Sequence, residues 1–360
     1  MILPNTYISA LLLAVLSMLC WGSWANSYKL TGKWRFELFY WDYSFGVLIA
    51  ALIAAFTFGT LGSDGFAFTD DLFAVAGKRN IAFGFGAGVV FNLANMLLVA
   101  AIAVGGMSLA FPVGIGLALV IGVVWNYLIK PQGEPTLLFM GVALVVAAIV
   151  LDALAYSALS KAKAKELIKS GKAKSTKVKA SWKGIVLSIA SGLLMGAFYP
   201  LVELGKQGPN GLGPYAIGFV FSVGIFVSTF PFNLFFLSLP VQGEPLEVLD
   251  YFKGTSKQHL LGLLGGGVWA VGTIANFVVS SATKAASPSA GSDGGGVPLL
   301  GPAISYALGQ GATLISALWG LLVWKEFRGA DGHVRIMLGL MLALFAVGLA
   351  LISTAAFFGR

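Results

Sequence analysis

Residues 135–158 read PTLLFMGVALVVAAIVLDALAYSA, and this stretch decides the class of fold. Its only charged side chain is Asp152, and its apolar residues run on without the alternation typical of a half-buried strand. In an α-helix these residues extend for about 36 Å at ~1.5 Å per residue, which covers the ~30 Å hydrocarbon core of a bilayer. We therefore expect a membrane-spanning helix here.

Segments of the same kind recur along the whole chain. Backbone groups in lipid must be satisfied within the spanning segment, so continuous apolar runs indicate helices rather than a barrel. Composition agrees, because 58% of the 360 residues are hydrophobic, 11% are charged and the mean hydropathy is +0.87. The sequence predicts an all-α, multi-pass protein of a cell membrane, either a plasma membrane or a bacterial inner membrane. The ten expected spans are 5–27, 40–62, 80–103, 107–129, 135–158, 184–204, 214–239, 259–283, 298–324 and 334–357.

The distribution of positive charge predicts the orientation of these spans. With ten spans, both termini lie on one side of the membrane. Seventeen of the 23 Lys and Arg residues fall in the loops after the odd-numbered spans, and the other six fall on the opposite side. Because positively charged loops stay in the cytoplasm, we expect both termini outside. The net charge of +8 then orients helices, and we expect no nucleic-acid partner.

The two halves of the chain resemble each other when they are aligned at the lysine-rich middle. Asn95 matches Asn276, and Trp125 matches Trp319. We expect a first five-helix repeat at 1–158, a lysine-rich cytoplasmic loop at 159–183 and a second five-helix repeat at 184–360, with an insertion near 286–297. Five is an odd number, so the two repeats must be inverted relative to each other. Inverted repeats are typical of secondary transporters.

Polar residues inside the spans are the candidates for a solute site, because they are costly in lipid and face the interior of the bundle. Amides offer donors and acceptors, which suits a neutral polar solute, and aromatic rings can stack on a flat heterocycle. Hydrogen bonding between helices and core packing are the structural alternatives for each residue. The candidate substrate-binding residues are Trp21, Trp24, Asn92, Asn95, Tyr199, Trp269, Thr273, Asn276, Gln310 and Thr313.

Two carboxylates within the spans, Asp152 and Glu203, are the candidates for proton coupling. A carboxylate at depth costs about 2.5–3.5 kcal/mol unless it is neutralised or hydrated, so a group that gains and loses a proton suits this role. For both residues, a side chain that only reaches interface water is the alternative.

Enzymatic constellations are almost absent from the sequence. The two histidines, His259 and His333, are far apart, and Cys20 is the single cysteine. Neither a metal-ligand spacing nor a nucleophile motif is present. We expect no enzymatic activity, no metal and no cofactor.

Five short motifs along the chain are distinctive in combination: Gly22-Ser23-Trp24, Tyr40-Trp41-Asp42-Tyr43, Leu93-Ala94-Asn95, Trp319-Gly320-Leu321-Leu322 and Glu326-Phe327-Arg328. They resemble motifs of the ureide permease family of the drug/metabolite transporter superfamily, and the resemblance covers nearly the whole chain. That family is similar to the glucose/ribose porters of the same superfamily. The resemblance implies ten helices, a cytoplasmic central loop and proton-coupled uptake of allantoin, uracil and related oxo-heterocycles.

The resulting hypothesis is a secondary active transporter that moves a small polar heterocycle by alternating access. Its expected partners are that solute, protons, membrane lipid and a second copy of the chain as a homodimer. A monosaccharide transporter and a metabolite or drug exporter of the same superfamily are the alternatives. A membrane scaffold, which would show no saturable flux, is the alternative from another class.

Overall fold

The computed structural model describes residues 1–105, 110–169, 182–240, 243–284 and 297–358. The first half contains α1 (Tyr7–Ser23), α2 (Ala25–Leu30), α3 (Phe36–Phe56), α4 (Phe68–Asp70), the π-helical turn η1 (Asp71–Val75), α5 (Lys78–Gly105), the π-helical turn η2 (Phe111–Ile115), α7 (Gly116–Ile129) and α8 (Pro135–Lys169). The second half contains α9 (Trp182–Gly205), α10 (Pro214–Ser238), the 3-10 helix η3 (Val248–Lys253), α11 (Ser256–Ser281), α12 (Gly301–Gly309), α13 (Ala312–Leu318), the π-helical turn η4 (Trp319–Val323) and α14 (Gly332–Phe358). Two short antiparallel strands, β1 (Thr283–Lys284) and β2 (Val297–Pro298), are the only extended pairing in the described residues.

The predicted helical, multi-pass architecture is confirmed. The described residues form nine helices that are long and apolar enough to cross a membrane. The fourth expected span, 107–129, corresponds to a shorter apolar helix at Val113–Ile129, and residues 106–109 lie outside the described chain. Two of the spans are composite, since α1 and α2 form one and α12, α13 and η4 form another.

The lysine-rich middle differs from the expected loop at 159–183, because α8 continues through Lys169. Residues 161–166 alternate Lys and Ala and end in Glu166, and these residue types favour the helix. The rest of this segment, residues 170–181, and nearly all of the expected insertion near 286–297 lie outside the described residues.

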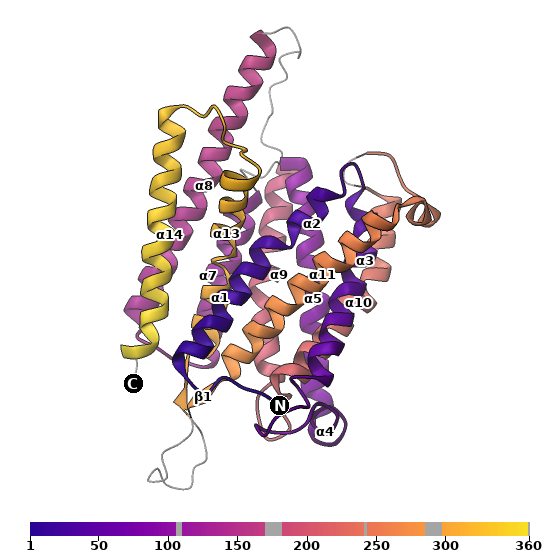
Figure 1. Cartoon of the computed structure of the whole chain (residues 1–360), viewed down its shortest axis with the longest axis vertical. Coiled ribbons are helices and arrows are strands. Elements are labelled where there is room, and N and C mark those ends of the chain that lie inside the picture. The colour runs from indigo at the N-terminus through magenta and orange to yellow at the C-terminus, as the bar shows by residue number, and fades with distance from the viewer. Residues whose placement is uncertain (106–109, 170–181, 241–242, 285–296, 359–360) are drawn as a thin grey trace.

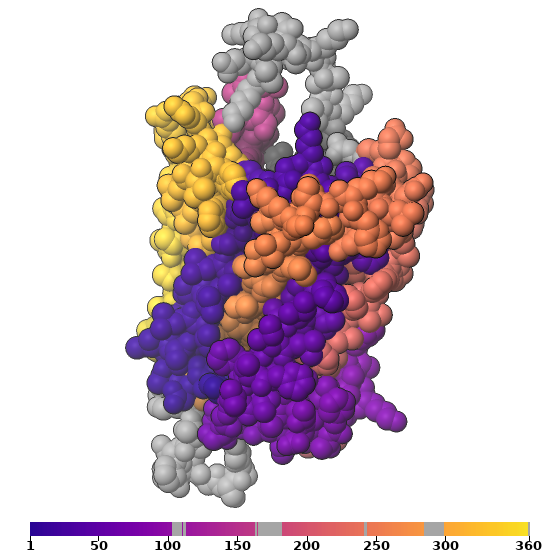
Figure 2. Space-filling model, turned by 45° about the vertical axis from the view of Figure 1, so that its right-hand side comes forward, coloured from indigo at the N-terminus to yellow at the C-terminus, as the bar shows by residue number. Residues whose placement is uncertain are grey.

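The long helices run side by side, and both termini lie at the same end of the bundle (Figure 1). We call this the terminus end. The closest helix pairs are α5 with α9, α8 with α14, α3 with α11, α5 with α10, α7 with α9, α1 with α11 and α3 with α10. Figure 2 shows one face of the molecule, where the N-terminal segments in indigo and purple lie beside α11 in orange. The opposite end, here called the lysine-rich end, holds α2 with Lys29 and the C-terminal part of α8 with Lys161 (Figure 1).

Two helix crossings are too close for any side chain at a central glycine. A Cβ on Gly88 of α5 would lie 2.1 Å from the carbonyl oxygen of Phe221 on α10. A Cβ on Gly266 of α11 would lie 1.9 Å from the carbonyl oxygen of Tyr43 on α3. Without a strong hydrophobic force between helices in lipid, such backbone contact is a main source of packing energy.

Candidate functional site

A cavity of about 170 Å³ lies where α1, α5, α9 and α11 meet the junction of α12 and α13, and we call it the central cavity. Six of the ten candidate substrate-binding residues line it: Trp21, Trp24, Asn95, Trp269, Gln310 and Thr313. The remaining lining residues are Gly22, Ala25, Phe91, Leu98, Ile115, Met195, Phe198, Ala312 and Ser316. The wall is therefore largely aromatic and apolar, with a few polar groups, as is typical of small-molecule sites.

Two spans are interrupted beside this cavity. Trp24 separates α1 from α2, and Gln310 with Gly311 separates α12 from α13. At the second break the N–H of Gly311 bonds back to Leu308 instead of continuing the regular ladder. Discontinuous helices of this kind form the solute sites of many secondary transporters, because irregular backbone at membrane depth is tolerated where it lines a cavity.

Two amides with unused hydrogen-bonding capacity border the central cavity. Asn95 donates from Nδ2 to the hydroxyl of Tyr40 at 3.1 Å, and its Oδ1 accepts no hydrogen bond from the described residues. The side-chain amide of Gln310 makes no hydrogen bond within the described chain. These side chains are 6% and 9% exposed and line the cavity, so the groups without a partner in the described chain are available to what occupies it.

Aromatic rings form the other recognition surface. The rings of Trp21 and Trp269 are nearly parallel, with 16° between their planes and 6.4 Å between their centroids. Trp269 stacks in turn on Phe91 at 4.5 Å. Thr273 does not line the cavity, but its hydroxyl oxygen accepts the indole N–H of Trp21 at 2.9 Å and thereby holds that ring in place.

Three further candidates, Asn92, Tyr199 and Asn276, are fully buried and lie outside the lining. Oδ1 of Asn276 accepts the hydroxyls of Tyr199 at 2.6 Å and Ser305 at 3.0 Å, and Nδ2 donates to Ser17 at 3.1 Å. This network joins α9, α11, α12 and α1 on the side of the cavity that faces the terminus end.

Toward the lysine-rich end, the central cavity adjoins a larger space of about 470 Å³. The two share the lining residues Ala25, Thr313 and Ser316. We call the larger space the Asp152 chamber, after the candidate proton-coupling residue that lines it. The central cavity thus borders this chamber on one side, and the buried Tyr199–Asn276 network lies on the other.

Asp152 has an unusual environment in this chamber. Its Oδ1 is buried and has no hydrogen-bond partner in the described chain. Lys29 forms an ion pair with Glu326, which also accepts the hydroxyl of Tyr156 at 2.7 Å. The cation of the chamber is therefore engaged by the other carboxylate, and no described residue forms an ion pair with Asp152.

Glu203, the second candidate for proton coupling, lies near the terminus end and does not reach the central cavity. It forms an ion pair with Lys206 at 2.6 Å and accepts the hydroxyl of Ser280 at 2.9 Å. Both charged side chains are almost fully buried. Because both charges are paired and Glu203 is hydrogen-bonded to Ser280, this pair connects the end of α9 to α11 and has a structural role.

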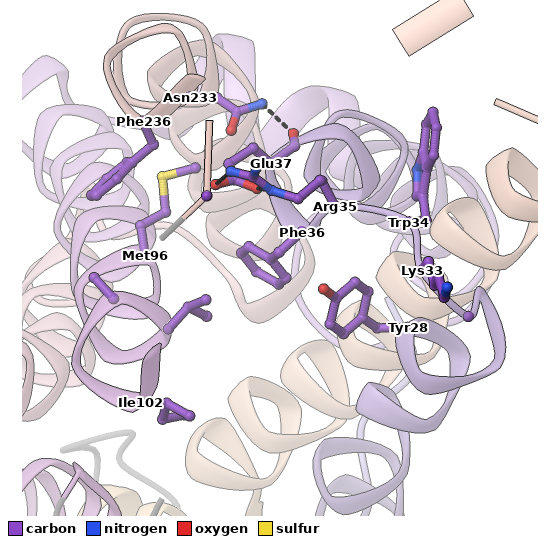
Figure 3. Close-up of a pocket in the computed structure, with 14 residues that line it drawn as sticks. Tyr28, Lys33, Trp34, Arg35, Phe36, Glu37, Met96, Ile102, Asn233 and Phe236 are labelled. Atoms are coloured by element: carbon purple, nitrogen blue, oxygen red, sulfur yellow. Dashed lines mark hydrogen bonds and ion pairs between the residues drawn. The ribbon is translucent and has the colours of Figure 1, made fainter. Parts of the chain in front are cut away.

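A third space of about 510 Å³ opens between α5, α10 and the segment after α2, as Figure 3 shows. Arg35 donates from Nη2 to Glu37 at 2.7 Å, and Asn233 donates to the backbone carbonyl of Glu37 at 2.7 Å. Met96 and Phe36 supply apolar wall beside this charged pair. Its ion pair and amide donor are already engaged, so it is a weaker solute site than the smaller central cavity.

Comparison with known proteins shows similarity to membrane permeases. Residues 39–184 match the family described as "Ureide permease". The chain is 26% identical to "Ureide permease 1" of Arabidopsis thaliana, over 96% of this chain and 95% of that protein. It is 25% identical to "Probable ureide permease A3" of Vigna unguiculata, over 66% of this chain and 79% of that protein. A solved structure titled "Crystal structure of protein" shares the fold, with a TM-score of 0.56 at 14% identity and coverage of 95% of this chain and 97% of that one.

The apolar helices and these relatives together define the class, a multi-pass membrane transporter rather than an enzyme. Within that class, the chain is similar in sequence to two ureide permeases of Arabidopsis thaliana over nearly its whole length.

Proposed function

We propose that this protein is a secondary active transporter that takes up a small planar heterocycle bearing N–H and C=O groups, of the ureide or nucleobase type, together with a proton. The observation that carries the proposal is the pair of amides, Asn95 and Gln310, that border an aromatic cavity with free hydrogen-bonding groups. The similarity to proteins named ureide permeases supports this solute class.

The chemistry of the central cavity suits such a solute. The free carbonyl oxygen of Asn95 accepts an N–H, and the amide of Gln310 both donates and accepts. The parallel rings of Trp21 and Trp269 favour a flat, conjugated ring system. A volume of about 170 Å³ is small beside the ~300–1,000 Å³ of sites for drug-sized ligands, which favours a single small solute.

Alternating access is supported by the asymmetry of the cavity. It adjoins the Asp152 chamber on one side, and we infer that the buried Tyr199–Asn276 network closes the other. With the lysine-rich end in the cytoplasm, as the charge distribution predicts, this structure is the inward-open state. Uptake then requires the network to open toward the terminus end and the cavity to close beside Thr313.

The packing pattern supports two inverted repeats that move against each other. The two repeats can be compared by exchanging equivalent helices: α1 with α9, α3 with α10, α5 with α11, α7 with α12 and α13, and α8 with α14. Under this exchange, each main pair of packed helices becomes another main pair or itself. Thus α5 packs on α9 as α11 packs on α1, and α3 packs on α11 as α10 packs on α5. The pairs α3–α10, α7–α12 and α8–α14 are each exchanged with themselves.

Reciprocal glycine contacts at two crossings support the same exchange. Each glycine faces a backbone carbonyl of the other helix, and all of these positions are related by a single shift along the sequence. The contacts are Gly88 with Phe221, Gly224 with Phe85, Gly266 with Tyr43, and Gly46 with Leu263. The shift pairs Asn95 with Thr273, one helical turn from the Asn276 expected from sequence alignment.

Asp152 is the proposed proton-coupling residue, because it lines the chamber next to the cavity and no described residue forms an ion pair with it. An uncompensated carboxylate within a span costs about 2.5–3.5 kcal/mol, and a bound proton removes that cost. Glu203 is the weaker candidate, because Lys206 already compensates its charge.

The test is initial uptake of labelled uracil and labelled allantoin into transporter-deficient cells, with and without an inward proton gradient. The proposal predicts saturable uptake of at least one of them, stimulated by the gradient and unaffected by excess glucose. Glucose inhibition would favour the monosaccharide alternative. A verified, membrane-inserted protein that moves neither solute would contradict the proposal.

A further inference from the structure

We propose that Tyr40 is a positioning residue that sets the specificity of the central cavity by fixing which end of the Asn95 amide faces the solute. This inference rests on the proposed function. Tyr40 is fully buried on α3 and does not line the cavity, so it acts through Asn95.

Two hydroxyl groups on α10 determine which atoms donate and which accept along the chain of hydrogen bonds to Asn95. The hydroxyl of Ser228 donates to the carbonyl of Gly224 at 2.7 Å, and that of Thr229 donates to the carbonyl of Ile225 at 2.8 Å. Both hydroxyl protons are therefore used within the helix. Their oxygens are left as acceptors, and Nδ2 of Asn92 donates to them at 2.8 Å and 3.1 Å.

This arrangement fixes the orientation of two further groups. Because the nitrogen of Asn92 must face α10, its Oδ1 faces Tyr40 and accepts the tyrosine hydroxyl at 2.7 Å. That hydroxyl has only one proton, so toward Asn95 it can act only as an acceptor. The group of Asn95 that lies 3.1 Å from it must be Nδ2, the donor.

The fixed orientation of Asn95 determines which solutes the central cavity can bind. With one N–H of Nδ2 held by Tyr40, the Asn95 amide cannot turn over, so its carbonyl oxygen stays on the side away from Tyr40 as an acceptor without a partner in the described chain. A solute with an N–H at that point completes the chain of hydrogen bonds, whereas one without it leaves a buried acceptor unpaired. Sites built to bond a solute N–H reject the analogue that lacks it far more strongly than shape alone can.

The chain offers a matched control on the same helix. Tyr43 lies one turn from Tyr40, the two rings stack at 5.0 Å, and both are fully buried. The hydroxyl of Tyr43 has no hydrogen-bond partner in the described chain. Tyr40→Phe and Tyr43→Phe therefore delete the same atom from neighbouring positions, and only the first interrupts the route to Asn95.

The experiment compares transport of uracil with that of 1,3-dimethyluracil, which has no N–H. Wild type is expected to prefer uracil by at least tenfold in kcat/KM. Tyr40→Phe frees the Asn95 amide to turn over, so the preference should fall about tenfold, through a higher KM for uracil with kcat within twofold. Tyr43→Phe should keep the wild-type preference. Steric exclusion of the methyl groups would persist in both variants, so an undiminished preference in Tyr40→Phe would overturn the proposal.

A double-mutant cycle separates positioning from a structural role. If Tyr40 acts through Asn95, Tyr40→Phe should change the preference no further in an Asn95→Ala background, and a full additional loss would overturn the proposal. Should Tyr40→Phe fail to insert, Asn92→Leu tests the same relay, because it lets the Tyr40 hydroxyl donate to Asn95 and reverses that amide. An unchanged uracil preference in Asn92→Leu would overturn it. Absence of uracil and allantoin transport by wild type would instead remove the proposed function.

Discussion

Tyr199 donates its hydroxyl proton to Oδ1 of Asn276 across 2.6 Å, and this bond joins α9 to α11 between the central cavity and the terminus end. Tyr199→Phe removes it together with the longer bond of the same hydroxyl to the Asn276 backbone carbonyl at 3.3 Å, and leaves the side-chain bonds of Asn276 to Ser17 and Ser305 in place. A buried hydrogen bond contributes about 1 kcal/mol, so we expect the population open toward the terminus end to rise about fivefold.

The measurement is the labelling rate of a cysteine placed at Ala312, which lines the cavity, in a Cys20→Ser background. A membrane-impermeant reagent is added on the terminus side. Tyr215→Phe is the control, since its hydroxyl donates to the carbonyl of Ile2 at 2.8 Å, away from the network. Equal labelling of both variants would show that the Tyr199–Asn276 bond does not keep that side closed.

Asp152→Asn should uncouple transport from the proton gradient. The amide is neutral at every pH and keeps the shape of the carboxyl, so uptake should persist but lose its stimulation by an inward gradient. Uptake over a range of external pH measures this, with the exposed Asp70→Asn as the charge-matched control. Gradient-stimulated uptake of wild-type size in Asp152→Asn would assign coupling to another group.

Gly88 and Gly86 stand two residues apart on α5 and should respond in opposite ways to alanine. At Gly88 the added methyl would meet the Phe221 carbonyl at 2.1 Å, so α5 and α10 must separate. At Gly86 the added methyl would have no atom within 4 Å apart from the nearby backbone of its own helix. Gly88→Ala should lower the melting temperature of the purified protein clearly, whereas Gly86→Ala should leave it unchanged or raise it slightly. Equal melting temperatures would mean that the crossing is looser than described.

Asp71, in the turn between α4 and α5, should make stability depend on pH. Burial raises the pKa of its carboxyl to about 6, against the opposing hydrogen bond from the Gly213 N–H at 2.9 Å. The folded protein therefore holds this proton more tightly than the unfolded chain, whose aspartate titrates near 3.8. The contribution is favourable below that value and is lost as the pH rises to about 6.

Asp71→Asn keeps an acceptor for Gly213 and cannot ionise. Its melting temperature should exceed that of wild type at pH 7, and the difference should shrink as the pH falls toward 4. A difference that stays constant over this range would exclude Asp71 as the origin of the pH dependence.

The helices were predictable because a bilayer requires long apolar segments. The composite spans and the shortened span are also apolar in sequence, so the same pattern predicts them. The sequence predicts a loop after Ala158, because a cluster of lysines is typical of a cytoplasmic loop. The same Lys and Ala residues have high helix propensity, so α8 continues. Which orientation the bundle takes in the membrane stays a prediction from charge.

The sequence predicted which types of residue form the site better than it predicted the role of each one. Asn92 and Asn95 share a face of α5, yet Ser228 and Thr229 bind the first while the second borders the cavity. Those partners come from α10, more than a hundred residues away, and no local pattern contains them. Asp152 was identifiable alone, because it is the single charge in its apolar run.

Other residues of the site were missed for the same reason. Phe91 and Phe198 line the cavity but were not among the candidates, although each is adjacent in the sequence to one of them, Asn92 and Tyr199 respectively. Tyr40 was part of a family-like motif, and only the hydrogen-bond directions across three helices give it a role.

The most direct test of the central claim uses purified protein in proteoliposomes loaded with unlabelled uracil or allantoin. Counterflow of the labelled solute is followed for wild type and for Asn95→Ala reconstituted at equal density. The account predicts a transient accumulation of label with wild type and a much smaller one, at the same solute concentration, with Asn95→Ala. Equal accumulation by the two proteins would contradict a solute site at Asn95, and no accumulation of either solute by wild type would contradict the transport of this solute class.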